Sequence, residues 1–307
     1  MTITVVGSIA YDTVKTPLGR RERMLGGAAT HFALAASFFG TVRVVGPVGG
    51  DFRQTDMDRL STRGTVTDDI TRVSNGTTFF WAGEYGLDMN SRQTLDTQLG
   101  VFGDFAPDLS VSARACDVLF LANIQPTLQA SVLDQCDRPH WTALDSMDMW
   151  IETARDDLVR VIQRVDCVSF NDAEIRQLTG KRSLLAGARE LLAMGPGAVI
   201  AKQGEYGSVL ITAEGFFSLP AFPVEGVVDP TGAGDTFAGG VAGYVASRAP
   251  RPVTHDTLRT AVAYGTALAS FNVEEFGTDR LARLRIDEVQ ERVAQLHKMT
   301  QFTNPLA

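Results

Sequence analysis

The 307-residue sequence has only three cysteines, Cys116, Cys136 and Cys167, and no Cys-x-x-Cys pair. An odd number of widely spaced cysteines argues against a disulfide framework and is not the pattern of a zinc site. We therefore expect buried free thiols in a reducing compartment, which predicts a cytoplasmic protein.

Long hydrophobic runs are absent as well. No apolar segment approaches the roughly 20 residues that a membrane helix needs. The sequence starts with a strand-like run at residues 2–6, and it has no charged segment followed by a long apolar one. We therefore expect neither a signal peptide nor a membrane partner.

Basic residues are also fewer than acidic ones, with 28 Lys and Arg residues against 36 Asp and Glu residues, which gives a net charge of −8. No basic run occurs, so the sequence offers no face that neutralises nucleic-acid phosphates, and we expect no nucleic-acid partner. An acidic protein can still bind an anion locally, through helix N-termini and a few placed cations.

Hydrophobic residues make up 44% of the chain, enough for a large core. Short apolar, β-branched runs alternate with longer amphipathic segments, which is typical of a mainly parallel sheet covered by helices on both faces. No internal repeat divides the chain, so we expect one domain over residues 1–307. The expected strands are 3–6, 42–45, 118–121, 142–144, 167–170 and 199–201, and the expected helices include 151–165 and 184–194.

Two segments, residues 12–25 and about 70–103, interrupt this alternation. They are rich in Thr, Gly and aromatic residues, and the run 77–85 reads as an antiparallel strand. We predict that the two segments pair into a small β-sheet that acts as a lid over the main domain. The alternative is a fixed edge hairpin. The same sheet could pair with a second subunit, which predicts a homodimer.

The most specific motif is the glycine-rich segment 228–240, Val-Asp-Pro-Thr-Gly-Ala-Gly-Asp-Thr-Phe-Ala-Gly-Gly. Pro230 and two glycines prevent regular structure before Asp235, and apolar residues recur at helical spacing after it. The segment is therefore predicted to be a loop that opens a helix. The backbone N–H groups of Gly232, Ala233 and Gly234 then converge on one point, which suits an anion such as a phosphoryl group in transfer.

Asp235 places a carboxylate at the same point. Phosphoryl transfer to an alcohol needs such a base near the acceptor hydroxyl, so Asp235 is the candidate catalytic base. The alternative is a carboxylate that only caps the helix. The loop is neither a Walker A motif, because no Gly-Lys-Ser/Thr follows, nor a dinucleotide-binding fingerprint.

This segment resembles the C-terminal signature of the ribokinase-like carbohydrate kinases, also called the PfkB family. Further segments are similar to the family's other motifs in the same order, so the resemblance covers nearly the whole chain. It implies a three-layer α/β/α ribokinase-like fold with a mainly parallel central sheet, a small β-sheet lid, and ATP as phosphoryl donor. The matching segments are Gly7 to Asp12, the Gly26-Gly27 pair before a helix at 28–39, Asn171-x-x-Glu174 and Lys202-x-Gly204-x-x-Gly207.

The resemblance also implies a substrate site. Asp12 would accept hydroxyl groups of the acceptor, and Gly26 and Gly27 would let the chain pass close to it. His31 could bond a hydroxyl or point into the helix packing. Sugar-binding members often carry Asn where Ala10 and His31 stand here, so specificity for ribose or fructose is not implied.

Nucleotide and metal sites follow from the same resemblance. Asn171 would lie near the triphosphate, and Glu174 would order Mg²⁺ mainly through water. The two residues also fit a helix capping box, which is compatible with that role. Lys202, with the turn at Gly204 and Gly207, would lie beside the nucleotide, and its ammonium either touches phosphate or extends to solvent. Asp229 matches the region where many relatives bind a monovalent cation such as K⁺.

We therefore expect an ATP-dependent kinase that transfers the γ-phosphoryl group to a hydroxyl of a sugar, polyol or similar small molecule. The alternative is a nucleoside kinase, favoured by Phe79, Trp81 and Tyr85, whose rings could stack on a base. A nucleotide-binding protein without activity is a third hypothesis, against which the intact loop and Asp235 argue. Arg92 could meet a substrate phosphate or remain solvated.

Overall fold

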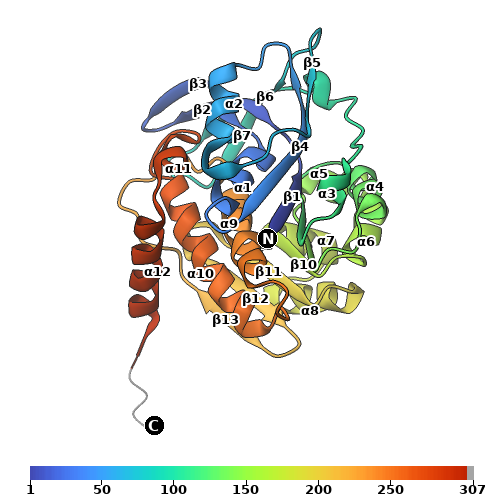
Figure 1. Ribbon diagram of the computed structural model, residues 1–307. Helices are drawn as coiled ribbons and strands as arrows, with labels where there is room; N and C mark the ends of the chain where they lie inside the picture. The colour runs from blue at the N-terminus through green and yellow to red at the C-terminus, as the bar shows by residue number, and fades with distance from the viewer. Residues whose placement is uncertain (303–307) are drawn as a thin grey trace.

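The computed structural model describes residues 1–302, which form a large sheet flanked by helices and a smaller sheet at the top of the molecule (Figure 1). The large sheet has the order β13-β12-β11-β10-β9-β8-β1-β4-β5 and is parallel from β5 to β11, while the pairs β11–β12 and β12–β13 are antiparallel. The prediction of a mainly parallel sheet is confirmed. Its strands are β1 Thr2–Val6, β4 Thr41–Gly49, β5 Ile70–Val73, β8 Val118–Leu121, β9 Trp141–Leu144, β10 Cys167–Asn171, β11 Ala198–Lys202, β12 Ser208–Thr212 and β13 Phe216–Leu219.

Helices cover both faces of this sheet and bury it. The central strands β1, β8 and β9 are buried almost throughout, which explains why they read as continuous apolar runs. One core lies under α1, α9 and α10 and another under α4, α6, α7 and α8, which gives the three α/β/α layers. The helices are α1 Ala28–Ala36, α2 Gln54–Leu60, α3 Val111–Arg114, α4 Pro126–Gln135, α5 Asp148–Thr153, α6 Arg155–Ile162, α7 Asp172–Thr179, α8 Leu184–Met194, α9 Ala233–Arg248, α10 His255–Asn272, α11 Asp279–Arg283 and α12 Ile286–Thr300.

Two predicted helices differ from the structure. The single helix expected over 151–165 is wrong, because Ala154, at φ −142° and ψ 36°, separates α5 from α6. Asp156 and Asp157 lie in the first turn of α6, where carboxylates favour a helix start. The helix expected over 28–39 ends at Ala36, where the Ser37 hydroxyl donates to the Leu34 carbonyl.

The smaller sheet has the order β3-β2-β6-β7, and β2 and β6 are its parallel pair. Residues 70–73 do not belong to it, contrary to the predicted boundary, because they form the edge strand β5 beside β4. This short, mostly exposed strand has no buried face that would mark it in the sequence. The strands of the smaller sheet are β2 Ala10–Thr16, β3 Gly19–Gly26, β6 Phe79–Tyr85 and β7 Arg92–Gln98.

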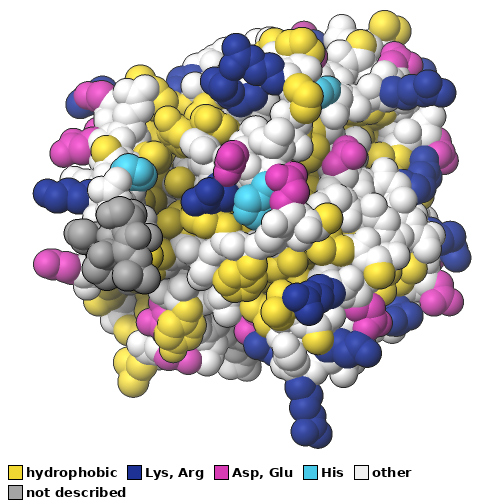
Figure 2. All heavy atoms as spheres, turned by 90° about the horizontal axis from the view of Figure 1, so that it is seen from below, with side chains coloured by type: hydrophobic (Ala, Val, Ile, Leu, Met, Phe, Trp, Pro, Cys, Tyr) yellow, Lys and Arg dark blue, Asp and Glu magenta, His cyan; other side chains and the backbone are white. Residues whose placement is uncertain are grey.

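The arrangement brings the predicted site residues to one edge of the large sheet. Parallel strands carry their carboxyl ends to the same edge, which is where α/β proteins bind ligands. Asp145, Asn171 and Lys202 stand at the ends of β9, β10 and β11, and the smaller sheet lies over that edge. Among residues 1–302, no helix has the length and apolarity to cross a membrane. On the face shown in Figure 2, Lys and Arg side chains stand scattered among acidic and uncharged ones.

Candidate active site

The glycine-rich loop turns into α9 through a left-handed residue. Gly232 has φ 74° and ψ 2° and precedes the first residue of the helix, Ala233. A β-carbon at Gly232 would overlap the ring of His31, so both the backbone angle and the space require glycine. The amides of Gly234 and Asp235 lie in the first turn, where helical N–H groups lack partners within the helix. The predicted loop-to-helix geometry is therefore present.

Asp235 lies in this first turn, where the charges of Asp145 and Lys202 act on it. Burial, and then the nearby charge of Asp145, raise its pKa to about 7, while Lys202 opposes the rise. A carboxyl group with a pKa near neutrality can exchange protons at physiological pH, which suits a general base.

Lys202 ends β11 and forms an ion pair with Asp145, which follows β9. The Lys202 Nζ atom also lies against the loop, since a β-carbon at Gly234 would be 3.4 Å from it. The Asp145 Oδ1 atom accepts a hydrogen bond from the Ser146 amide at 2.8 Å. Lys202 therefore does not extend to solvent, and its charge lies between Asp145 and the loop.

Asn171 and Glu174 form a capping box at the start of α7. The Asn171 Oδ1 atom accepts from the Glu174 amide at 2.7 Å, and the Glu174 Oε2 atom accepts from the Asn171 amide at 2.7 Å. Burial, and then the charge of Asp145, raise the pKa of Glu174 to about 7, and Lys202 opposes the rise. The capping interpretation is confirmed, and Glu174 also lies in the electrostatic field of the Asp145–Lys202 pair.

Asp12 brings a further buried carboxylate to the site from β2. Burial, and then the charge of Asp229, raise its pKa to about 7, and a hydrogen bond from the Gly27 amide opposes the rise. A β-carbon at Gly26 would overlap the Asp12 carboxylate, so Gly26 makes room for that side chain. Gly27, at φ 94°, is the N-cap of α1. The diglycine pair thus packs around Asp12.

His31 is only 1% exposed and lies beneath the loop. Its Nδ1 atom is 2.9 Å from the Asn272 Oδ1 atom, which also accepts from the Thr236 hydroxyl at 3.1 Å. The Asn272 amide nitrogen donates to the Thr231 carbonyl at 2.8 Å. This fixes the amide orientation, so His31 Nδ1 carries a proton. Burial lowers the pKa of His31 to about 4, so the ring is neutral.

Of the two alternatives for His31, the structure therefore favours helix packing over an open hydroxyl-binding position. Together, His31 and Asn272 support the loop from below. The part played by Asn272 was not predicted, and its only signal was a polar residue at the end of an apolar, alanine-rich helix.

Asp229 ties the loop to the segment after α10. Its Oδ1 atom accepts from the Thr231 amide at 2.9 Å, and its Oδ2 atom accepts from the Gly277 amide at 2.9 Å. The side chain is buried, which raises its pKa, and the hydrogen bond from Gly277 opposes the rise. Asp229 therefore shapes the backbone around residues 273–277.

A cavity of about 810 Å³ opens beside the loop. Its lining includes Lys202, Gly204, Gly207 and Gly234, which were predicted to lie beside the nucleotide, and also Ala233. The hairpin tips of the smaller sheet close its other side. At one tip, the Asn90 Nδ2 atom donates to the Glu205 Oε1 atom at 3.0 Å. The apolar lining includes Leu18, Leu87, Phe222, Val224, Phe237 and Val273.

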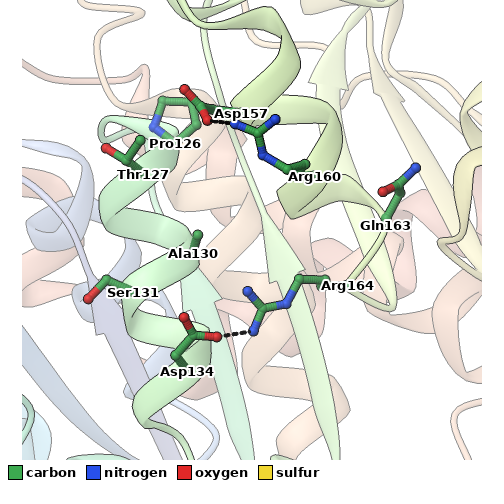
Figure 3. Close-up of a pocket in the computed structure, with 9 residues that line it drawn as sticks. All are labelled: Pro126, Thr127, Ala130, Ser131, Asp134, Asp157, Arg160, Gln163 and Arg164. Atoms are coloured by element: carbon green, nitrogen blue, oxygen red, sulfur yellow. Dashed lines mark hydrogen bonds and ion pairs between the residues drawn. The ribbon is translucent and has the colours of Figure 1, made fainter.

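A second hollow, of about 530 Å³, lies between α4 and α6 (Figure 3). Its rim carries the ion pairs Arg160–Asp157 and Arg164–Asp134, and Ala130 lies between them. None of the predicted site residues lines it. The candidate active site therefore belongs to the cavity beside the loop.

Known proteins resemble this chain along most of its length. The family described as pfkB family carbohydrate kinase matches residues 132–283. A cytidine kinase from Thermococcus kodakarensis is 32% identical over 257 residues, which is 80% of this chain and 89% of that protein. A nucleoside kinase from Methanothermobacter thermautotrophicus is 27% identical over 309 residues, which is 90% of each chain.

Solved structures show the same fold. The nucleoside kinase of Methanocaldococcus jannaschii matches with a TM-score of 0.77 at 20% identity, over 96% of this chain and 98% of that one. The ribokinase of Thermotoga maritima matches with a TM-score of 0.74 at 21% identity, over 96% and 99%. These findings confirm the predicted fold and the predicted reaction. The chain belongs to the PfkB family of carbohydrate kinases and is an ATP-dependent phosphotransferase with a hydroxyl group as acceptor.

Proposed function

We propose that this kinase phosphorylates nucleosides, with Asp235 as the catalytic base. The sequence placed a sugar or polyol first and a nucleoside second. The two curated relatives that span most of the chain are named as a cytidine kinase and a nucleoside kinase, which supports the nucleoside alternative. The observation that carries the mechanism is a carboxylate with a raised pKa in the first turn of α9, beside Lys202 and the loop.

In this mechanism Asp235 takes the proton of the acceptor hydroxyl as its oxygen bonds to the γ-phosphorus of ATP. The bond from that phosphorus to the bridging oxygen breaks, and ADP leaves. Negative charge on the phosphoryl oxygens faces the loop amides and the positive end of α9. Gly232, Ala233 and Gly234 let the backbone approach these oxygens, and His31 and Asn272 hold the loop in position.

The cavity beside the loop would hold ATP. Lys202 would lie along the phosphates near Gly234, and the apolar wall that includes Phe222, Val224 and Val273 would cover the base. The turn at Gly204 and Gly207 would form the cavity floor. Asn171 would approach the triphosphate through its side-chain amide nitrogen, because its side-chain oxygen and its backbone N–H are both engaged in the capping box.

The acidic groups fit a divalent ion that ATP brings with it. Within residues 1–302, no group of three or more His, Cys, Asp or Glu side chains could hold a metal by itself. Mg²⁺ typically keeps several waters and binds through phosphates and one or two carboxylates, and Glu174 beside Asp145 can supply these. When bound, the ion offsets charge on the phosphates. Both Asp229 oxygens already accept hydrogen bonds from backbone amides. Asp229 would therefore shape the backbone around a K⁺ site rather than bind the ion itself.

Replacing Glu174 by glutamine should raise the Mg²⁺ concentration for half-maximal rate about 10-fold. Glutamine at this position keeps the capping box but removes the negative charge. The measurement is a Mg²⁺ titration at fixed ATP. Asp172→Asn is the matched control, since Asp172 lies in the same helical turn and pairs with Arg176. An unchanged metal requirement in Glu174→Gln would contradict the proposed role.

The acceptor is tested with a panel of nucleosides and free sugars, read as ADP release with mass identification of the product. We expect cytidine or another nucleoside to exceed ribose and fructose in kcat/KM by at least about 10-fold. The physical reason is stacking of the base on aromatic rings of the smaller sheet, such as Trp81, which contributes about 1–3 kcal/mol. Turnover of sugars alone would instead support the second candidate, a sugar or polyol kinase, in which Asp12 binds two hydroxyls.

Three sequence expectations stay proposals. We propose that residues 1–307 act as one kinase domain, with β2, β3, β6 and β7 as its lid. A homodimer would form through the smaller sheet, whose edge strand β7 is exposed along its whole length. A cytoplasmic location would supply the ATP that the reaction consumes.

A further inference from the structure

Arg92 is the first residue of β7, at the end of the smaller sheet that meets the loop. It pairs across the sheet with Tyr85 of β6. The Tyr85 hydroxyl accepts a hydrogen bond from the Thr231 hydroxyl at 3.2 Å, within the glycine-rich loop. Residues paired across antiparallel strands share one face, so Arg92 lies on the face that meets the loop.

Among residues 1–302, the guanidinium of Arg92 has no ionic partner. It lies 5.5 Å from the centre of the Trp81 ring. In the part of the chain that the structure describes, it forms no hydrogen bond or ion pair. Other cations of the smaller sheet are paired, Lys15 with Glu84 and Arg20 with Glu22. Arg92 therefore keeps its five N–H donors available for a ligand.

The charge of Arg92 reaches the catalytic carboxylate. Burial raises the pKa of Asp235, and both Lys202 and Arg92 oppose that rise. Burial also raises the pKa of Tyr85, and Arg92 opposes it too, after the hydrogen bond from Thr231. Of these two cations, Lys202 is already paired with Asp145, whereas Arg92 has no such partner within the described residues.

A phosphoryl group in transfer adds negative charge to a site that is already acidic. Asp12, Asp145, Asp229, Asp235 and Glu174 all lie in or around it. The backbone amides of the glycine-rich loop can donate hydrogen bonds to one face of that phosphoryl group. The opposite face, toward the smaller sheet, needs a cation of its own, because charge developing in a site that excludes water is stabilised by fixed donors.

We propose that Arg92 is a catalytic residue, delivered by the smaller sheet, that donates hydrogen bonds to the phosphoryl group during its transfer. The acceptor oxygen bonds to phosphorus, the bond to ADP breaks, and the hydroxyl proton goes to Asp235. Arg92 stays protonated throughout and neutralises charge on the non-bridging oxygens. The inference rests on phosphoryl transfer and does not depend on whether the acceptor is a nucleoside.

The test compares Arg92→Ala and Arg92→Lys with the control Arg20→Ala, an exposed arginine of the same sheet. With cytidine and ATP, Arg92→Ala should lower kcat by about 10²-fold and change both KM values by less than about threefold. Arg92→Lys should recover part of the loss, and added guanidinium chloride should restore activity to Arg92→Ala more than equal sodium chloride does. Arg20→Ala should match the wild type.

A second measurement needs no acceptor. Aluminium fluoride with ADP and Mg²⁺ mimics the phosphoryl group in transfer, and calorimetry should show that it tightens ADP binding in the wild type but not in Arg92→Ala. An increase in KM for the acceptor with unchanged kcat would overturn the proposal, because Arg92 would then bind an anionic acceptor in its ground state. Wild-type kinetics matched by Arg92→Ala would overturn it as well.

Failure of the nucleoside proposal can be told apart from failure of the Arg92 proposal. The nucleoside proposal is wrong if the wild type phosphorylates no nucleoside. Arg92 is then assayed with the best sugar of the panel and with ADP–aluminium fluoride. Loss of the fluoride effect in Arg92→Ala would still support its role, and a retained effect would overturn it.

Discussion

Asp235→Asn should lower kcat by about 10²–10⁴-fold while ATP affinity changes little. Asparagine fills the same space in the first turn of α9 but cannot accept the hydroxyl proton. The ATP cavity is lined by other residues, among them Lys202 and Gly234. The matched control is Asp256→Asn, which also removes a carboxylate from the first turn of a helix, α10. A variant that kept more than about a tenth of wild-type kcat would remove Asp235 from the mechanism.

The wild type and Asp235→Asn should also differ in the pH dependence of kcat/KM. A general base must be ionised to act, so wild-type kcat/KM should rise with pH and level off above about pH 7, the raised pKa of Asp235. The residual activity of Asp235→Asn should lack that rise.

The stability of the wild-type protein should fall as pH rises, whereas its kcat/KM rises. Because the pKa of Asp235 is near 3.8 in the unfolded chain and about 7 in the folded one, the folded state binds more protons between these values, and stability falls as pH rises through that window. Asp235→Asn removes this cost. Its Tm should therefore exceed that of the wild type near pH 8 and approach it near pH 4.

The sequence could predict those features that depend on local pattern. The strands β1, β8 and β10 read as apolar runs because helices bury both of their faces. The loop before Asp235 was recognisable because glycine and proline limit the backbone there. The sequence-based predictions were wrong at exposed or interrupted elements, namely the edge strand β5 and the break between two helices at Ala154. In those places tertiary packing, and no local period, decides the structure.

Contacts between residues far apart in the sequence could not be predicted from local sequence pattern. Asp145 and Lys202 each follow a strand, but their pairing depends on β9 and β11 lying on either side of β10. His31 and Asn272 are 241 positions apart and meet only because α1 and α10 both pack near α9. The sequence could therefore identify the glycine-rich loop and Lys202 as parts of the candidate site, but not the ion pair with Asp145 or the His31–Asn272 hydrogen bond.

The largest effect on stability is expected from Lys202→Met. Breaking a buried ion pair by removing one partner typically costs about 3–5 kcal/mol, because the other charge stays buried without compensation. The Asp145 side chain is only 7% exposed, and that of Lys202 is 18% exposed. Burial alone would lower the pKa of Lys202, but Asp145 and Glu174 hold it above its usual value, which shows how strongly the site favours the cation.

The measurement is urea denaturation followed by circular dichroism. Lys15→Met is the control, because Lys15 and its partner Glu84 are exposed, and such pairs contribute about 0–1 kcal/mol. The double variant Lys202→Met with Asp145→Asn should recover much of the loss, since neither charge then remains unpaired. The loss in the single variant should be larger near pH 8 than near pH 5. Glu174 and Asp235, whose pKa values are about 7, are mostly protonated at the lower pH and ionised at the higher one, where Lys202 offsets them. A loss no greater than that of Lys15→Met would mean that water already screens the pair, and Lys202 would then act on bound phosphate alone.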